Sequence, residues 1–126
     1  MAERSLLDTT MLIETIEHGR HTGLLDVENS ISIISLYEFI RHKKKMEENK
    51  LLLENSFNVI SISNPTILKA AEIFLKLKEN GITINENDIQ IASAAMVNSL
   101  RLYTKDKDFL KIKANFEDFK LQFVGD

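Results

Sequence analysis

The stretch Ile84-Asn85-Glu86-Asn87-Asp88-Ile89-Gln90-Ile91-Ala92-Ser93-Ala94-Ala95-Met96 organises this chain. It begins with polar residues, places the carboxylate of Asp88 in the expected first turn of a helix, and continues with small residues. Ala92, Ala95 and Ser99 follow at helical intervals, so the acid and a face of small residues lie on one side of the predicted helix. We therefore expect a helix that packs closely on its neighbours, and we ask which other acids meet Asp88.

Length and composition favour a single globular domain over residues 1–126. The chain has 126 residues, of which 44% are hydrophobic and 28% charged, and this is enough to bury a core without disulfides or a structural metal. The net charge of −3 gives no overall attraction for nucleic acid, although a local basic patch is compatible with it. The absence of cysteine excludes disulfides, thiolate catalysis and cysteine-bound zinc.

The N-terminal residues carry no targeting pattern. Residues 1–5 lead into an apolar run of only two leucines before Asp8, so neither a signal peptide nor a membrane span is expected. We expect a cytoplasmic protein that does not bind membranes.

Short apolar and β-branched runs alternate with helical patterns along the chain. This alternation predicts a three-layer α/β/α sandwich with a central, mainly parallel sheet. A Ser35-x-x-Glu38 capping box is expected to start the second main helix, and Asn64-Pro65 a later one that ends at Asn80-Gly81. The expected strands are 5–7, 31–34, 57–62, 101–104 and 120–124, and the expected helical segments are 11–16, a short piece near 24–27, 35–46, 51–53, 64–79, 86–96 and a last one that contains Phe109 and Leu110.

Four carboxylates are predicted to reach one edge of the sheet. Asp8, Glu38 and Asp106 each follow a predicted strand, and Asp88 enters from the helix before the fourth strand. In parallel α/β sheets, ligands bind outside the carboxyl ends of the strands, where the strand order reverses. The sequence therefore predicts a polar site at this edge.

Helix capping is the competing explanation for each acid, because carboxylates stabilise helix N-termini without any catalytic role. Taken together, however, four ionised carboxylates roughly 5 Å apart repel one another by about 3 kcal/mol per pair at an effective dielectric constant near 20. Such a cluster needs a cation, and oxygen ligands suit Mg²⁺ or Mn²⁺. The hydroxyl groups of Ser35 and Thr104 could orient a ligand or cap a helix.

Three other features are better explained by the fold or by solvent. His18 and His21 have a spacing that could serve a metal, but they lie in a glycine-flanked loop and are expected to be exposed. The basic run 41–45 could guide phosphate toward Glu38, although five consecutive residues wrap around a helix and a solvated face is favoured. The apolar stripe from Ile67 to Leu77 is expected to be core.

Four segments of the chain carry these acids: Leu6-Leu7-Asp8-Thr9-Thr10, Ile33-Ile34-Ser35-Leu36-Tyr37-Glu38-Phe39, Asp88-Ile89-Gln90-Ile91-Ala92-Ser93-Ala94-Ala95 and Tyr103-Thr104-Lys105-Asp106-Lys107-Asp108-Phe109. In this order they resemble the PIN domain, in the small form found as VapC-type toxins of toxin–antitoxin modules. The resemblance covers nearly the whole chain. Ser93 stands where alanine is usual, and the basic run replaces a glycine often found shortly after the glutamate, which bears on contacts with an antitoxin or a second subunit.

The resemblance implies a metal-dependent endoribonuclease that uses one or two Mg²⁺ or Mn²⁺ ions to cleave RNA, expected to be single-stranded. It also implies a cognate antitoxin and a homodimer. Asp108 is an accessory ligand candidate, and Thr9, Ser35 and Thr104 are expected to support the site. The residues that match the catalytic and metal-binding acids of the family are Asp8, Glu38, Asp88 and Asp106.

Other α/β proteins fit the sequence less well. A receiver domain needs an acceptor aspartate after the third strand, where Ile62-Ser63-Asn64 has none. A haloacid-dehalogenase-like phosphatase needs a second acid two residues after Asp8, where Thr10 stands. The remaining alternative is a catalytically silent PIN module that binds RNA or protein.

Overall fold

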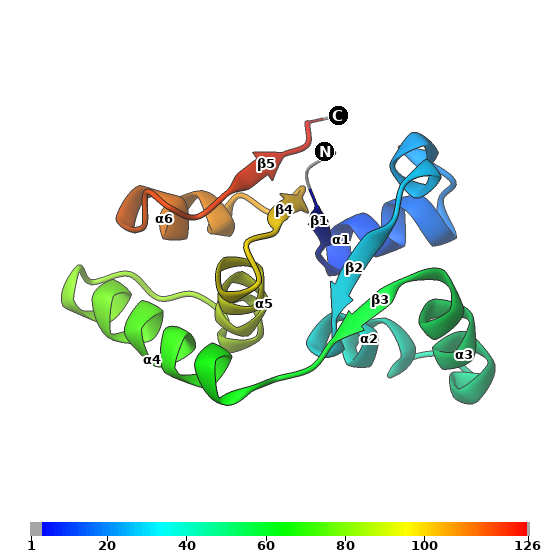
Figure 1. The fold of residues 1–126 in the computed structure, drawn as a ribbon, viewed down its shortest axis with the longest axis horizontal. Coiled ribbons are helices and arrows are strands. Elements are labelled where there is room, and N and C mark those ends of the chain that lie inside the picture. The colour runs from blue at the N-terminus through cyan, green and yellow to red at the C-terminus, as the bar shows by residue number, and fades with distance from the viewer. Residues whose placement is uncertain (1–3, 126) are drawn as a thin grey trace.

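A five-stranded parallel sheet forms the centre of the computed structural model, which describes residues 4–125 (Figure 1). The strand order is β3-β2-β1-β4-β5, and all four pairings are parallel, which confirms the predicted sheet. The chain fills one side of β1 first and the other side later, so the strand order reverses between β1 and β4. The strands are β1 Ser5–Leu7, β2 Asn29–Ser32, β3 Asn58–Ile60, β4 Arg101–Thr104 and β5 Leu121–Phe123.

Helices cover both faces of this sheet, as the α/β/α prediction required. In Figure 1, α4 and α5 lie on one side of the strands and α2 and α3 on the other. The segment near 24–27 forms a short 3-10 helix, Thr22–Asp26, as expected. The α-helices are α1 Thr9–Leu12, which continues as a π-helical segment Ile13–Glu17, α2 Ile33–Ile40, α3 Met46–Ser56, α4 Asn64–Glu79, α5 Glu86–Val97 and α6 Asp108–Asn115.

Two adjacent residues of β1 show how the core is divided. The side chain of Leu6 joins the buried cluster formed with α4, α5 and α6. The next side chain, Leu7, points to the opposite face and joins the cluster formed with α1, α2 and α3. Both are fully buried, as expected for the central strand of a sheet that is covered on both faces.

Helix α5 has the predicted start and the predicted close packing. Asn85 caps it by accepting a hydrogen bond from the Asn87 N–H, and Ala92 and Ala95 are completely buried. The inclusion of Ser99 in this face was wrong. The helix ends at Val97, and Ser99 lies beyond it, exposed and in the left-handed region with φ of 54°.

Helix α2 begins two residues earlier than predicted. The side chain of Ser32 accepts the Ile34 N–H at 3.0 Å, so β2 ends at Ser32 instead of continuing to Ile34. The predicted capping box from Ser35 to Glu38 was therefore wrong, because both residues lie inside the helix. Packing of Leu36 on the core outweighs the β-propensity of the two preceding isoleucines.

The predicted helix through residues 35–46 is interrupted. Helix α2 ends at Ile40, and the basic run 41–45 forms the connection to α3, which begins at Met46. The run therefore lies on a turn, and the expectation that it wraps around a helix was wrong. The predicted helical segment 51–53 is part of α3.

Helix α4 is capped by Ser63, one residue before the predicted Asn64. Ser63 and Thr66 form a reciprocal capping box, and Pro65 lies in the first turn. The end at Asn80-Gly81 is as predicted, and Gly81 has a φ of +71° that favours glycine.

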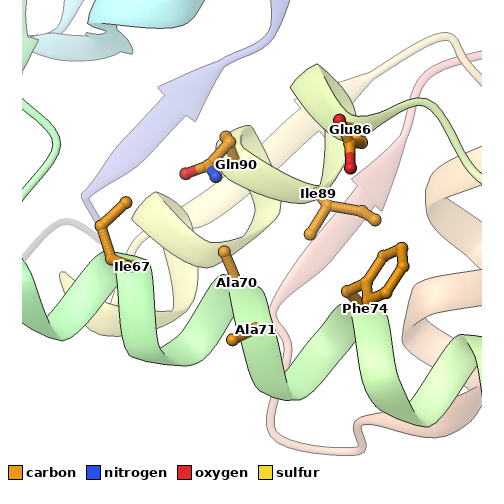
Figure 2. A pocket seen from close by; sticks show the side chains of 7 residues that line it. All are labelled: Ile67, Ala70, Ala71, Phe74, Glu86, Ile89 and Gln90. Carbon is orange, nitrogen blue, oxygen red and sulfur yellow. The ribbon is translucent and has the colours of Figure 1, made fainter.

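The expectation that the stripe from Ile67 to Leu77 is core was only partly correct. Ala70 and Leu77 are buried, but Ile67 and Phe74 are 50% and 47% exposed. Helix α4 is covered by α5 and α6 on one side only, so its other side faces solvent. A groove of about 300 Å³ lies between α4 and α5. Figure 2 shows the side chains that line it, which are Ile67, Ala70, Ala71, Phe74, Glu86, Ile89 and Gln90.

The remaining boundaries are close to those predicted. Strand β4 has the predicted range, whereas β3 and β5 are shorter than 57–62 and 120–124. Within residues 4–125, no helix has the length and apolar character needed to cross a bilayer.

We expect two phenylalanines to contribute very differently to the free energy of unfolding. Phe109→Ala removes a fully buried ring and should lower the free energy of unfolding by about 3–5 kcal/mol. Phe74→Ala, at the half-exposed site on α4, should cost only about 1 kcal/mol. Urea unfolding measures both values, and equal losses would contradict the assignment of core and surface.

Candidate metal centre

Asp8 stands at the point where the strand order reverses, directly after β1. It is 2% exposed and caps α1 by accepting the Met11 N–H at 3.0 Å, so the capping explanation is correct for this acid. The Thr10 hydroxyl donates to Oδ1 at 2.6 Å, and the Thr104 hydroxyl donates to Oδ2. Burial raises the pKa of Asp8, against the opposing effect of these hydrogen bonds.

Thr104 joins Asp8 to the acids after β4. This completely buried residue ends β4, and its hydroxyl accepts the Asp106 N–H at 2.9 Å while it donates to Asp8. Asp106 in turn accepts the N–H of Asp108, the first residue of α6, at 2.9 Å. The loop after β4 is thereby held against the end of β1.

Asp88, Asp106 and Asp108 form a group that could hold a metal ion. One carboxylate oxygen from each residue lies within 4.8 Å of the other two. Asp88 occupies the first turn of α5, while Asn85 caps that helix. No hydrogen bond to the Asp88 carboxylate is made by residues 4–125, and Asp108 lies 3.2 Å from Lys111 Nζ in an exposed ion pair.

The electrostatic environment of Asp88 includes all the predicted acids. Burial, as the largest cause, and the negative charges of the neighbouring acids together raise the pKa of Asp88 to about 7; the acids are, in decreasing order of effect, Asp106, Glu38, Asp8 and Asp108. The other acids therefore lie close enough to Asp88 to disfavour its charged form. A cation bound between them would relieve this repulsion.

Glu38 reaches the site from the middle of α2, so capping does not explain it. The Thr9 hydroxyl donates to Oε1 at 2.7 Å and lies 3.2 Å from the Ser35 hydroxyl, and Ser35 is fully buried. The Asn87 side chain donates to Oε2 at 3.4 Å. Glu38 is thus held from both α1 and α5.

Two residues that contact the acids were missed by the sequence interpretation. Thr10 donates to Asp8 and accepts the Lys105 N–H at 3.0 Å, which connects the ends of β1 and β4. Asn87 holds Glu38. Thr10 lies two residues after Asp8, and Asn87 directly precedes Asp88. This closeness to an acid at a helix start was the only feature of the sequence that could have indicated their roles.

The other candidates do not join this group. His18 and His21 are exposed, as expected. Lys43 of the basic run forms an ion pair with Glu17 on the neighbouring π-helical segment.

Comparison with known proteins agrees with this geometry. Residues 5–115 match the model of the PIN domain family. The chain belongs to this family. A curated relative, Ribonuclease VapC1 of Methanocaldococcus jannaschii, is 32% identical over 104 residues, which cover 81% of this chain and 75% of the relative.

Solved PIN-domain structures share the fold. VapBC from Salmonella typhimurium, solved bound to DNA, superposes with a TM-score of 0.79 at 21% identity, covering 97% of this chain and 98% of that chain. VapBC2 from Rickettsia felis, bound to a DNA fragment from its promoter, gives a TM-score of 0.77 at 23% identity and covers 96% and 98%. These similarities show the same architecture.

The acids have the chemistry of a site for a hard divalent cation. The grouped donors are carboxylate oxygens, which Mg²⁺ and Mn²⁺ prefer, and a bound cation would offset the burial and the neighbouring negative charges that raise the pKa of Asp88. Asp88, Asp106 and Asp108 would hold such an ion, with Asp8 and Glu38 beside them. Their assignment as ligands remains a prediction.

The pKa of Asp88 predicts a pH-dependent stability. Its folded-state pKa of about 7 exceeds the ordinary value of 3.8, so the folded state binds the proton more tightly than the unfolded chain. This stabilisation is complete below about 3.8 and is lost as the pH rises through 7. Asp88→Asn should therefore raise the melting temperature of the metal-free protein at about pH 8 and leave it nearly unchanged near pH 4.

Asp26→Asn serves as the control for this experiment, because Asp26 is exposed and precedes β2, at the N-terminal ends of the strands and away from Asp88. Melting is followed by circular dichroism with a chelator present. An equal shift at both pH values for Asp88→Asn would contradict the assignment of the raised pKa to this residue.

Proposed function

We propose that the chain is a Mg²⁺- or Mn²⁺-dependent endoribonuclease that cleaves phosphodiester bonds of single-stranded RNA. The observation that carries this proposal is the grouping of Asp88, Asp106 and Asp108 within 4.8 Å, beside the buried Asp8. The name of the M. jannaschii relative, a ribonuclease, supports the same activity. Asp8, Glu38, Asp88 and Asp106 are the proposed catalytic and metal-binding residues, with Asp108 as a further ligand.

The surrounding residues would fix the geometry of this site. A divalent cation supplies Lewis acidity and neutralises negative charge that develops on the phosphodiester. Thr104 and Thr10 hold both oxygens of Asp8, whereas Thr9 and Asn87 hold those of Glu38. Because these four donors come from three elements, α1, α5 and β4, the acids keep their separation before substrate arrives.

We further propose that the chain is the toxin of a toxin–antitoxin pair. Support comes from the VapC name of the relative and from the VapBC complexes among the structural neighbours. A cognate antitoxin would be its inhibitor, and the chain would act as a homodimer. We propose one PIN-like domain over residues 1–126, acting in the cytoplasm.

The proposed function is tested by three substitutions that keep shape and remove charge. Asp8→Asn, Glu38→Gln and Asp88→Asn should each fold and bind Mn²⁺ more weakly in calorimetric titration. Each should cleave single-stranded RNA at least roughly 100-fold more slowly, because the loss of a residue that only orients a metal ligand already costs up to about 100-fold. Asp26→Asn and Glu28→Gln are matched controls, because both acids are exposed and precede β2, at the N-terminal ends of the strands and away from the acidic centre.

Unchanged Mn²⁺-dependent cleavage in all three variants would overturn the assignment of activity to this site. An unaltered chain that binds RNA but never cleaves it would identify a catalytically silent PIN module.

A further inference from the structure

The solvent side of α2 carries an exposed row of residues with no role in the core. Ile33 and Tyr37 lie one turn apart on the helix surface, and Arg41, the C-cap residue whose αR backbone continues the helical path, follows one turn later. Tyr37 is 56% exposed and Ile33 39%. The core-facing residues of α2, Leu36 and Phe39, lie on the opposite side of the helix. The ring of Tyr37 therefore contributes little to the stability of the fold.

Tyr37 is paired with a cation. The Arg41 guanidinium lies 5.3 Å from the centroid of the Tyr37 ring, within the range of a cation–π contact. Both groups are planar, and the guanidinium keeps its positive charge at any physiological pH. The pair offers a π surface and a fixed positive charge at one place.

This pair is adjacent to the proposed catalytic acid Glu38. Tyr37 precedes Glu38 in the sequence, and at about 100° per residue Arg41 falls between the two around the helix. Glu38 is held toward α1 and α5 by Thr9 and Asn87. Helix α2 therefore carries Glu38 on the side that faces the acidic centre and the Tyr37–Arg41 pair on the adjacent, solvent-facing side.

An RNA substrate needs positive charge near this acidic centre, because phosphates and carboxylates repel each other. The turn 41–45 is the nearest basic segment to Glu38 in the sequence. Lys43 forms an ion pair with Glu17, and Lys45 Nζ lies 3.9 Å from a carboxylate oxygen of Glu48. Arg41 and Lys44 form no ion pair within residues 4–125, so their charges can meet phosphate.

We propose that Tyr37 and Arg41 bind single-stranded RNA beside the acidic centre. A base stacks on the Tyr37 ring, and Arg41 contacts a neighbouring phosphate, with Lys44 adding to the local positive charge. Stacking on an aromatic ring combined with a cation is the usual way in which proteins bind unpaired nucleotides. This inference rests on the proposed function and names how the same site holds its substrate.

The binding test uses the whole chain, EDTA to prevent metal-dependent cleavage, and a fluorescein-labelled single-stranded RNA of roughly 12 nucleotides. Tyr37→Ala should raise Kd about tenfold by fluorescence anisotropy, and Tyr37→Phe, which keeps the ring, should retain binding. Arg41→Ala should weaken binding and reduce the slope of log K against log salt by about 0.7, whereas Tyr37→Ala leaves this slope unchanged.

Phe74→Ala is the matched control, because this ring on α4 is similarly exposed at 47%. It should leave RNA binding unchanged. Failure of the unaltered chain to bind this RNA, or equal Kd values for Tyr37→Ala and the unaltered chain, would overturn the inference. A changed sedimentation coefficient for Tyr37→Ala with unchanged RNA binding would assign the pair to a protein contact instead.

Steady-state cleavage with Mn²⁺ separates this inference from the proposed function. If the unaltered chain cleaves RNA, Tyr37→Ala should raise KM about tenfold with little change in kcat. Cleavage with an unchanged KM in Tyr37→Ala would refute the RNA-binding pair alone. No cleavage by the unaltered chain, with the expected loss of binding in Tyr37→Ala, would refute the ribonuclease alone.

Discussion

The acidic centre depends on the parallel pairing of β1 with β4. The Asp8 N–H continues this ladder by donating to the Tyr103 carbonyl at 3.2 Å, and this contact places the end of one strand beside the end of the other. Thr104 then contacts Asp8 with its hydroxyl and Asp106 through the same oxygen. A backbone ladder and one buried hydroxyl thus bring together acids that are far apart in the chain.

The sheet and most of its helices were predictable because they follow from local patterns. Apolar and β-branched runs predicted five strands, of which the second lies two residues earlier than predicted, at Asn29–Ser32. The acids that follow three of these strands indicated the end of the sheet at which they meet. Features decided by tertiary contacts were not predictable. The start of α2 depends on the Ser32 cap and on core packing, and the exposure of Phe74 depends on the single side from which α4 is covered. The donors Thr10 and Asn87 gain a role only once the strands are assembled.

The centre also shows how structural and chemical roles can belong to one residue. Asp8 caps α1 and is a proposed ligand, so helix capping and metal binding are compatible explanations for it. Glu38 has no capping role, and Thr9 and Asn87 hold it in place instead. Burial and the neighbouring negative charges, which together raise the pKa of Asp88, make the metal-free fold less stable above neutral pH and favour a bound cation.

The contact between Thr104 and Asp8 joins residues that are 96 positions apart, and this separation has a consequence for protein synthesis. A ribosome makes Asp8 and Glu38 early, but β4, Asp106 and Asp108 come much later. A nascent chain that lacks β4 cannot position its first acids against the others, whatever helices it has already formed. The proposed metal site is therefore incomplete until translation has passed residue 108.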